Sequence, residues 1–200
     1  MFVQILQGKV ADAEALRRQW DEWIAQLAPA AVGWLGSTAG ITPDDEWVGV
    51  ARFESEEAAR RNSDRPEQGE WWARTEPCFA GPVAFHDCVD VSLMLAGGSD
   101  DAGFVQVMQG KVRDRARLEA VEEEMESVLS ELRPDFIGGL RAWHSGDRFS
   151  DVIWFTSEAE AREGEQKELP EDLKASFEEW TSLVSDVSWH DLNDPWLASP

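Results

Sequence analysis

The chain has 200 residues, 42% hydrophobic and 29% charged, which suits two soluble domains of about 100 residues each. Asp and Glu number 40 against 18 Lys and Arg, and both halves are acidic, with 16 acidic and 8 basic residues in 1–96 and 24 and 10 in 97–200. Nucleic acid and anionic membranes bind clustered positive charge, and neither half has such a cluster, so we expect neither as a partner. No apolar run approaches the roughly 20 residues that span a bilayer, so we expect a cytoplasmic protein.

The first predicted strand, Phe2–Val10, returns almost unchanged as Phe104–Val112. Seven of nine positions are identical, and the other two exchange one apolar side chain for another. A strand-sized segment that recurs at a spacing of 102 residues predicts that one module occurs twice.

A helix follows each repeated strand. Asp12 is placed to cap the first helix, whose apolar residues recur at helical spacing until Pro29, and the matching stripe in the second copy runs to Pro134. Two strands come next in each copy, at 32–38 and 47–53 and at 137–144 and 149–155, joined by predicted hairpins of different length at 39–45 and 145–148. A second helix then begins at Ser55 or Ser157, and Glu160 gives Ser157 the spacing of a capping box.

A fourth strand closes each copy, at residues 83–87 and 187–191, and both strands carry an aromatic residue followed by His and Asp. Each copy therefore has the order βαββαβ, in which two helices cover one face of a four-stranded antiparallel sheet. We predict an α+β fold of two tandem ferredoxin-like modules, residues 1–96 and 103–200, with a Gly-rich linker at 97–102.

The other face of each sheet would expose apolar side chains, which is unfavourable in water. Packing the two bare faces together covers them, so we expect the modules to form an intramolecular dimeric α/β barrel. Such a pseudo-dimer would be a monomer or a weak homodimer, and its interior could hold a small hydrophobic or aromatic ligand.

Segment Phe53–Arg61 has the pattern Phe-x-Ser-Glu-x-x-x-x-Arg, and Phe155–Glu158 is its partner in the second copy. Together with the βαββαβ order and the self-pairing of the modules, this pattern resembles the dimeric α/β-barrel superfamily, which includes antibiotic biosynthesis monooxygenase-like proteins. The resemblance covers almost the whole chain, twice. It implies a fold shared by cofactor-independent monooxygenases of polycyclic aromatic substrates, haem-degrading enzymes and many small proteins of unknown role, and fold alone does not choose among them.

The haem-degrading branch pairs an Asn on the first strand with a His near the end of the second helix. Here both first strands carry Gln and no Asn, and neither second-helix region contains a His, so we do not expect haem degradation. With no CxxC and three scattered His, we expect no metal and no other cofactor. A disulfide between Cys78 and Cys88 is not favoured in a reducing compartment.

Alternation along the strands predicts two inward-facing pairs, Gln4 with His86 and Gln106 with His190. A neutral His near pH 7 can withdraw an acidic phenolic or α-carbonyl proton, and Gln can orient a carbonyl group, so both His are candidate catalytic bases and both Gln candidate ligand-binding residues. The alternative interpretation is a structural hydrogen bond from each His at the edge of a core.

Eleven Trp and no Tyr are an unusual composition. Four of them fall on predicted strands, where some could stack on a planar ligand, although core filling is the alternative: Trp34, Trp47, Trp143 and Trp154. Arg52 is a further candidate ligand group, matched in the second copy by Trp154, and we align Gly36 with Arg141 in the same way. Such unlike pairs would mark a copy that has lost ligand groups, whereas a buried Arg paired with a carboxylate is the alternative.

Two functions of different class stay open. The first is a cofactor-independent monooxygenase-like enzyme that acts on a hydrophobic aromatic molecule in the barrel, with His86 or His190 as the base. The second is a non-catalytic small-molecule binding or stress-associated protein of the same fold.

Overall fold

The computed structural model describes residues 1–95, 97–144 and 146–200, and it divides into two compact units. Residues 1–91 and 191–200 form the first unit, and residues 92–190 form the second. Each contains a five-stranded antiparallel sheet with helices, so the predicted α+β class is confirmed. Ala96, the predicted end of the first module, and Ser145, the predicted start of a hairpin, lie outside the described residues.

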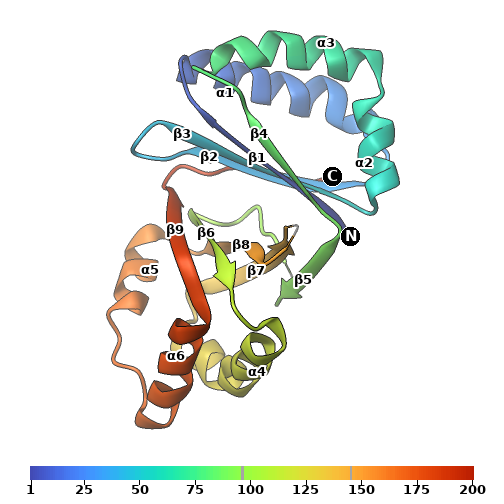
Figure 1. The fold of residues 1–200 in the computed structure, drawn as a ribbon. Coiled ribbons are helices and arrows are strands. Elements are labelled where there is room, and N and C mark those ends of the chain that lie inside the picture. The colour runs from blue at the N-terminus through green and yellow to red at the C-terminus, as the bar shows by residue number, and fades with distance from the viewer. Residues whose placement is uncertain (96, 145) are drawn as a thin grey trace. The chain divides into compact units, whose positions relative to one another are not determined.

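The sheet of the first unit has the strand order β10-β2-β3-β1-β4. Its strands are β1 (Phe2–Lys9), β2 (Trp34–Ile41), β3 (Glu46–Phe53), β4 (Ala84–Cys88) and β10 (Trp196–Ala198). Its helices are α1 (Ala13–Glu22), which continues into a π-helical turn η1 (Trp23–Leu27) and a 3-10 turn η2 (Ala28–Ala30), then α2 (Glu56–Ser63), α3 (Pro66–Thr75) and a short 3-10 turn η3 (Glu76–Cys78). Helices α1 and α3 lie side by side over one face of this sheet (Figure 1).

The sheet of the second unit has the order β5-β7-β8-β6-β9. Its strands are β5 (Asp90–Met94), β6 (Phe104–Val112), β7 (Phe136–Trp143), β8 (Arg148–Phe155) and β9 (Val184–Leu192). Its helices are α4 (Arg115–Leu132), α5 (Glu158–Glu165) and α6 (Glu171–Leu183). No helix within the described ranges is both long enough and apolar enough to cross a membrane.

Local signals start the helices where the sequence predicts. The Asp12 carboxylate accepts a hydrogen bond from the Ala15 N–H at 2.9 Å, which satisfies a donor that the first turn of α1 cannot pair. Ser157 accepts from the Glu160 N–H at 3.2 Å, and its hydroxyl donates to the Glu160 carboxylate at 2.9 Å. The predicted cap of α1 and the predicted pairing of Ser157 with Glu160 are therefore confirmed.

The two sheets share one register, which fixes the residues that are equivalent. One row across β1, β3 and β2 consists of Leu6, Gly49 and Ala39, and the matching row of the second unit consists of Met108, Asp151 and Arg141. The spacing of 102 residues holds through all three strands. Arg52 and Trp154 are thus equivalent as predicted, but the partner of Arg141 is Ala39, and its alignment with Gly36 was wrong.

The hairpins explain this error. Residues 42–45 join β2 to β3 and residues 144–147 join β7 to β8, so the two connections have the same length, contrary to the prediction. At a spacing of 102 residues, Pro134 comes three residues later than the equivalent of Pro29, which suggests that the following strands are displaced by three residues as well. The segment between Pro134 and β7 is three residues shorter, so the strands keep the spacing of 102.

Each sheet has a fifth strand that the sequence analysis missed. Strand β10 pairs with β2 through Trp196 and Ala39, Leu197 and Thr38, and Ala198 and Ser37. Residues 191–200 therefore belong to the first unit, although we predicted them in the second module. Strand β5 takes the edge position next to β7 in the second sheet. Added edge strands pair backbone groups of β2 and β7 that would otherwise need water.

Candidate functional site

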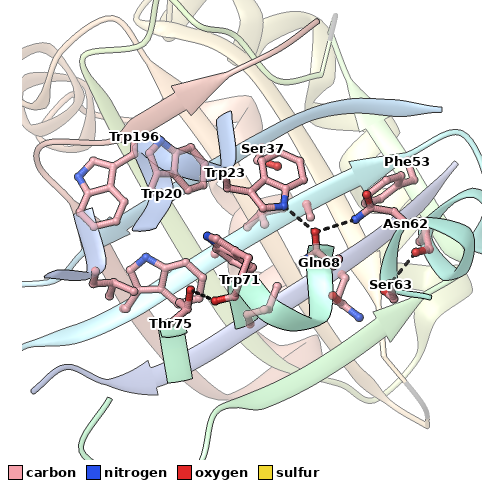
Figure 2. A pocket seen from close by; sticks show the side chains of 18 residues that line it. Trp20, Trp23, Ser37, Phe53, Asn62, Ser63, Gln68, Trp71, Thr75 and Trp196 are labelled. Atoms are coloured by element: carbon pink, nitrogen blue, oxygen red, sulfur yellow. Dashed lines mark hydrogen bonds between the residues drawn. The ribbon is translucent and has the colours of Figure 1, made fainter. Parts of the chain in front are cut away.

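A pocket of about 110 Å³ lies between the sheet and the helices of the first unit, lined by residues of that unit alone (Figure 2). Its floor is formed by strand residues, of which Ser37, Gly49 and Ala51 have short side chains. One row of the sheet places Gln4, Ala51 and Ser37 side by side, and the next row contains Gly49. A Cβ atom at Gly49 would lie 2.3 Å from the ring of Trp47, so glycine allows that ring to lie over the strand.

Indole rings form a large part of the wall. Trp20 and Trp23 come from α1 and η1, Trp71 from α3 and Trp196 from β10. The centroids of Trp20 and Trp196 lie 5.9 Å apart, and those of Trp23 and Trp71 lie 6.4 Å apart in an edge-on arrangement. Aromatic pairs in this range support one another, and they offer flat apolar surface to a ring-shaped ligand.

The polar side chains of the wall are held in place by hydrogen bonds. Gln68 Oε1 accepts from Trp23 Nε1 at 2.7 Å and from Asn62 Nδ2 at 3.3 Å, so Gln68 lies between these two residues in Figure 2. Thr75 Oγ1 donates to the Trp71 carbonyl at 2.9 Å. Among the described lining residues there is no Asp, Glu, His, Lys, Arg, Cys or Tyr. The pocket thus has polar groups that can orient a ligand and no titratable group that contacts it.

In the second unit, charged side chains occupy the layer between the sheet and the helices. Arg141 Nε and Nη2 donate to the two Asp151 oxygens at 2.7 and 2.6 Å, and Arg141 Nη1 donates to Glu122 at 2.7 Å. Trp180 Nε1 completes the network with a 2.8 Å hydrogen bond to Glu122. In the first unit Ala39, Gly49 and Trp20 stand at the positions of Arg141, Asp151 and Glu122, by the spacing of 102 residues.

Burial dominates the electrostatics of this network. Burial raises the pKa of Asp151. The charge of Arg141 and its two hydrogen bonds to the carboxylate act in the opposite direction and lower that pKa. At Arg141, burial alone would lower the pKa, and the Asp151 charge and hydrogen bonds outweigh burial and raise it. The bidentate geometry requires a guanidinium and a carboxylate, so the pair is ionised near neutral pH.

The predicted contact between Gln4 and His86 is wrong. Gln4 lies opposite Asp87 and donates to its carboxylate at 2.7 Å, whereas His86 lies opposite Ile5. Residues directly opposite one another in a sheet share a face, so Gln4 faces the helices and His86 faces the other way. His86 therefore does not line the pocket, and its catalytic role stays a prediction.

The second unit repeats this pattern for Gln106. It lies opposite Ile153, which packs with Phe104 and Phe155 in the helix-facing core. Gln106 is thus on the helix side as well, and only 7% of its surface is exposed. His190 is half-buried, with Nε2 3.4 Å from the Ser188 hydroxyl. Such a contact fits the structural interpretation, and a role as base is untested.

The remaining candidates lie beside the pocket or on the other face. Trp34 is buried, donates to Ser37 at 2.9 Å and meets Trp23 edge-on at 5.3 Å, so it supports the wall without lining it. Arg52 lies opposite Val3 and Trp154 opposite Val105, one residue out of phase with the helix-facing positions. Of the predicted ligand-binding residues, the pocket contains Gln4, and of the strand tryptophans that could stack on a ligand it contains Trp47.

Both cysteines are free thiols and buried. Burial, and then the nearby Asp87 charge, raises the pKa of Cys88 to about 11. Burial likewise raises the pKa of Cys78, with Asp12 contributing. Neither thiol lines the pocket.

Sequence reasoning missed most of the pocket, including Gly49, Asn62 and Gln68, although it named Trp47 among the strand tryptophans that could stack on a ligand. A signal was present, since aligning the two copies at a constant spacing of 102 residues sets Gly49 against Asp151 and Ala39 against Arg141. A small residue in one copy and a large residue at the equivalent helix-side position of the other copy indicate that the two copies pack this layer differently.

Fold and site together define a two-unit α+β protein with a Trp-walled pocket in its first unit. The chain has the fold of antibiotic biosynthesis monooxygenase-like proteins, as its sequence pattern suggested. It is similar over 99% of both chains to a "putative monooxygenase" from Lactobacillus acidophilus NCFM, with a TM-score of 0.74 at 10% identity. An anthrone oxidase-like protein matches 100% of this chain and 94% of its own, with a TM-score of 0.66 at 13% identity.

A third similar structure is an uncharacterised ferredoxin-fold protein from Listeria monocytogenes, related to antibiotic biosynthesis monooxygenases. It matches 100% of this chain and 95% of its own, with a TM-score of 0.51 at 9% identity. No protein-family model matches the sequence, and no curated protein is significantly similar to it. At these identities the likeness concerns the fold, so function has to be argued from the site.

Proposed function

We propose that the first unit binds a small aromatic molecule in its pocket. The observation that carries the proposal is a space of about 110 Å³ lined by five indole rings, over a floor that includes Ala51 and Gly49, whose equivalent in the second unit is the buried Asp151. An apolar cavity of about 150 Å³ is known to hold benzene, so a single aromatic ring is the most that this smaller space encloses, and a substituent would reach out of it. Trp20, Trp71 and Trp196 supply ring faces and edges for stacking.

Oxygenation of the bound molecule is the second candidate, favoured by the fold shared with proteins named as monooxygenase-like and anthrone oxidase-like. General base catalysis needs a titratable group within reach of the proton, and the described lining residues include none. A substrate would therefore have to be acidic by itself. An acidic benzylic methylene fits this requirement, because its carbanion can react with O2 to give a ketone and water.

Ligand binding is tested by titrating monocyclic aromatic compounds while Trp fluorescence is followed, with calorimetry as a second readout. Gly49→Ala is the informative variant, since its new Cβ would displace the Trp47 ring. Gly69→Ala is the matched control, because nothing lies within 4 Å of a Cβ there. We expect Gly49→Ala to weaken binding at least about tenfold and Gly69→Ala to leave it unchanged. Equal binding by both variants would show that the ligand binds outside this pocket.

Oxygen consumption separates the two candidates. A monocyclic aromatic with an acidic benzylic methylene is incubated with the protein under ¹⁸O2, and oxygen uptake and product mass are measured. Oxygenation predicts one labelled oxygen atom in the ketone and a rate that falls in Gly49→Ala. Binding without uptake above the protein-free rate supports the binding function alone.

A further inference from the structure

Trp47 differs from two other pocket tryptophans, Trp23 and Trp71, in its hydrogen bonding. It is 7% exposed, its ring lines the pocket, and its Nε1 is buried with no hydrogen-bond partner in residues 1–95, 97–144 and 146–200. By contrast, Trp23 donates to Gln68, and Trp71 donates to the Gln19 carbonyl at 2.8 Å. Buried N–H groups are nearly always paired, because leaving one unpaired forfeits the hydrogen bonds it makes with water.

Packing accounts for the six-membered ring of Trp47, which covers Gly49, but it does not account for the buried N–H group. The equivalent residue in the second unit is Phe149, which packs against Trp143 with ring centroids 5.8 Å apart. Trp47 makes the same kind of contact with Phe79, at 5.5 Å. An aromatic ring therefore meets this contact in both copies, and the indole of the first unit adds a larger ring, which covers Gly49, and an N–H group.

We propose that Trp47 Nε1 donates a hydrogen bond to an oxygen of the pocket's ligand, and that the ligand is a monocyclic aromatic with a neutral carbonyl group. This inference rests on the proposed binding function. A neutral oxygen is specified because the described lining residues contain no Lys or Arg, and a carboxylate would be desolvated there without a counter-ion. Trp47 is then the residue that distinguishes an aromatic ketone from a hydrocarbon of the same shape.

The test is a matched ligand pair on matched variants. Acetophenone and α-methylstyrene differ in one group, C=O against C=CH2, so they share shape and differ in their ability to accept a hydrogen bond. Wild type, Trp47→Phe and Trp143→Phe are titrated with both compounds. Trp143→Phe is the control, since Trp143 also has a buried Nε1 without a partner in the described parts of the chain, but it does not line the pocket.

We expect wild type to prefer acetophenone, and Trp47→Phe to reduce that preference about fivefold, the usual effect of one net hydrogen bond. Trp143→Phe should keep the wild-type preference. In wild type labelled with ¹⁵N-Trp, the indole N–H signal of Trp47 should move downfield with acetophenone and not with α-methylstyrene. This measurement needs no variant, so it stands even if Trp47→Phe folds poorly.

The outcomes separate this inference from the function on which it rests. If both compounds bind and the preference is the same in wild type and Trp47→Phe, the role of Trp47 is refuted while the pocket keeps its binding function. If neither compound binds wild type, both the inference and the proposed function fail.

Discussion

Ala51→Ile tests whether the pocket is open space in solution. Ala51 lies in the floor between Gln4 and Ser37, and its equivalent in the second unit is Ile153. The variant thus gives the first unit the residue that its own copy carries at the same place on the same kind of strand. Isoleucine is β-branched and suits a strand, so the backbone has no reason to change.

The expected magnitude follows from the added atoms. Three carbons at about 0.8 kcal/mol each give roughly 2.4 kcal/mol if all of them enter apolar space. Filling about 110 Å³ at roughly 24 cal/mol per Å³ gives a similar ceiling of about 2.6 kcal/mol. Ordering the new side chain costs about 0.5–1 kcal/mol. The free energy of unfolding should therefore rise by about 1.5 kcal/mol, and ligand binding should be lost.

Urea unfolding followed by Trp fluorescence measures the stability, and calorimetry measures the binding. Ile153→Ala is the reverse control in the second unit, where removing three carbons should cost about 2 kcal/mol and leave ligand binding intact. Overpacking a filled layer costs roughly 1–3 kcal/mol. A loss of stability in Ala51→Ile, or unchanged ligand binding, would refute the assignment of this space as the binding site.

Three further predictions concern other parts of the chain. Asp151→Asn, which leaves Arg141 without its bidentate partner, should cost about 3 kcal/mol in urea unfolding, whereas Asp21→Asn in an exposed pair should cost under about 1 kcal/mol. Trp196→Ala should weaken both ligand binding and the hydrogen-exchange protection of β2, because β10 pairs with β2 through three residues and Trp196 lines the pocket; full protection with lost binding would contradict this coupling. The folded protein raises the pKa of the Cys88 thiol to about 11, so the thiol holds its proton more tightly in the folded state than in the unfolded state. The free energy of unfolding should therefore stay level up to about pH 9 and fall by roughly 2–3 kcal/mol towards pH 11. Cys88→Ala should reduce this fall.

The repeated nonapeptide and the periodicity of the helices were enough to predict the α+β class and the βαββαβ order. These features are local, because strand alternation, caps such as Asp12 and breakers such as Pro29 act over a few residues. The family resemblance drew on the same signals, which is why it identified the fold and did not select a reaction.

The sequence did not allow us to predict to which face of a sheet a residue points. Gln4 and His86 both lie on strands, and a one-residue difference in the register of β1 against β4 decides whether they share a face. Register is set by pairing between segments about 80 residues apart in the chain, so no local pattern contains it. The pocket depends on the same long-range pairing, because Gln4, Ala51 and Ser37 become neighbours only across three strands.

The amino-acid sequence by itself determined that one module is used twice, since identical strands and matching helical stripes specify the same local structure wherever they occur. Tertiary structure decided which copy has room for a ligand. Between sheet and helices, one unit has the buried pair Arg141 and Asp151, and the other has a pocket lined by Trp47, Gly49 and Ala51. Space inside a protein is a property of side chains brought together from distant segments. The same holds for Trp196, which reaches the pocket of the first unit from the far end of the chain because edge pairing with β2 places it there.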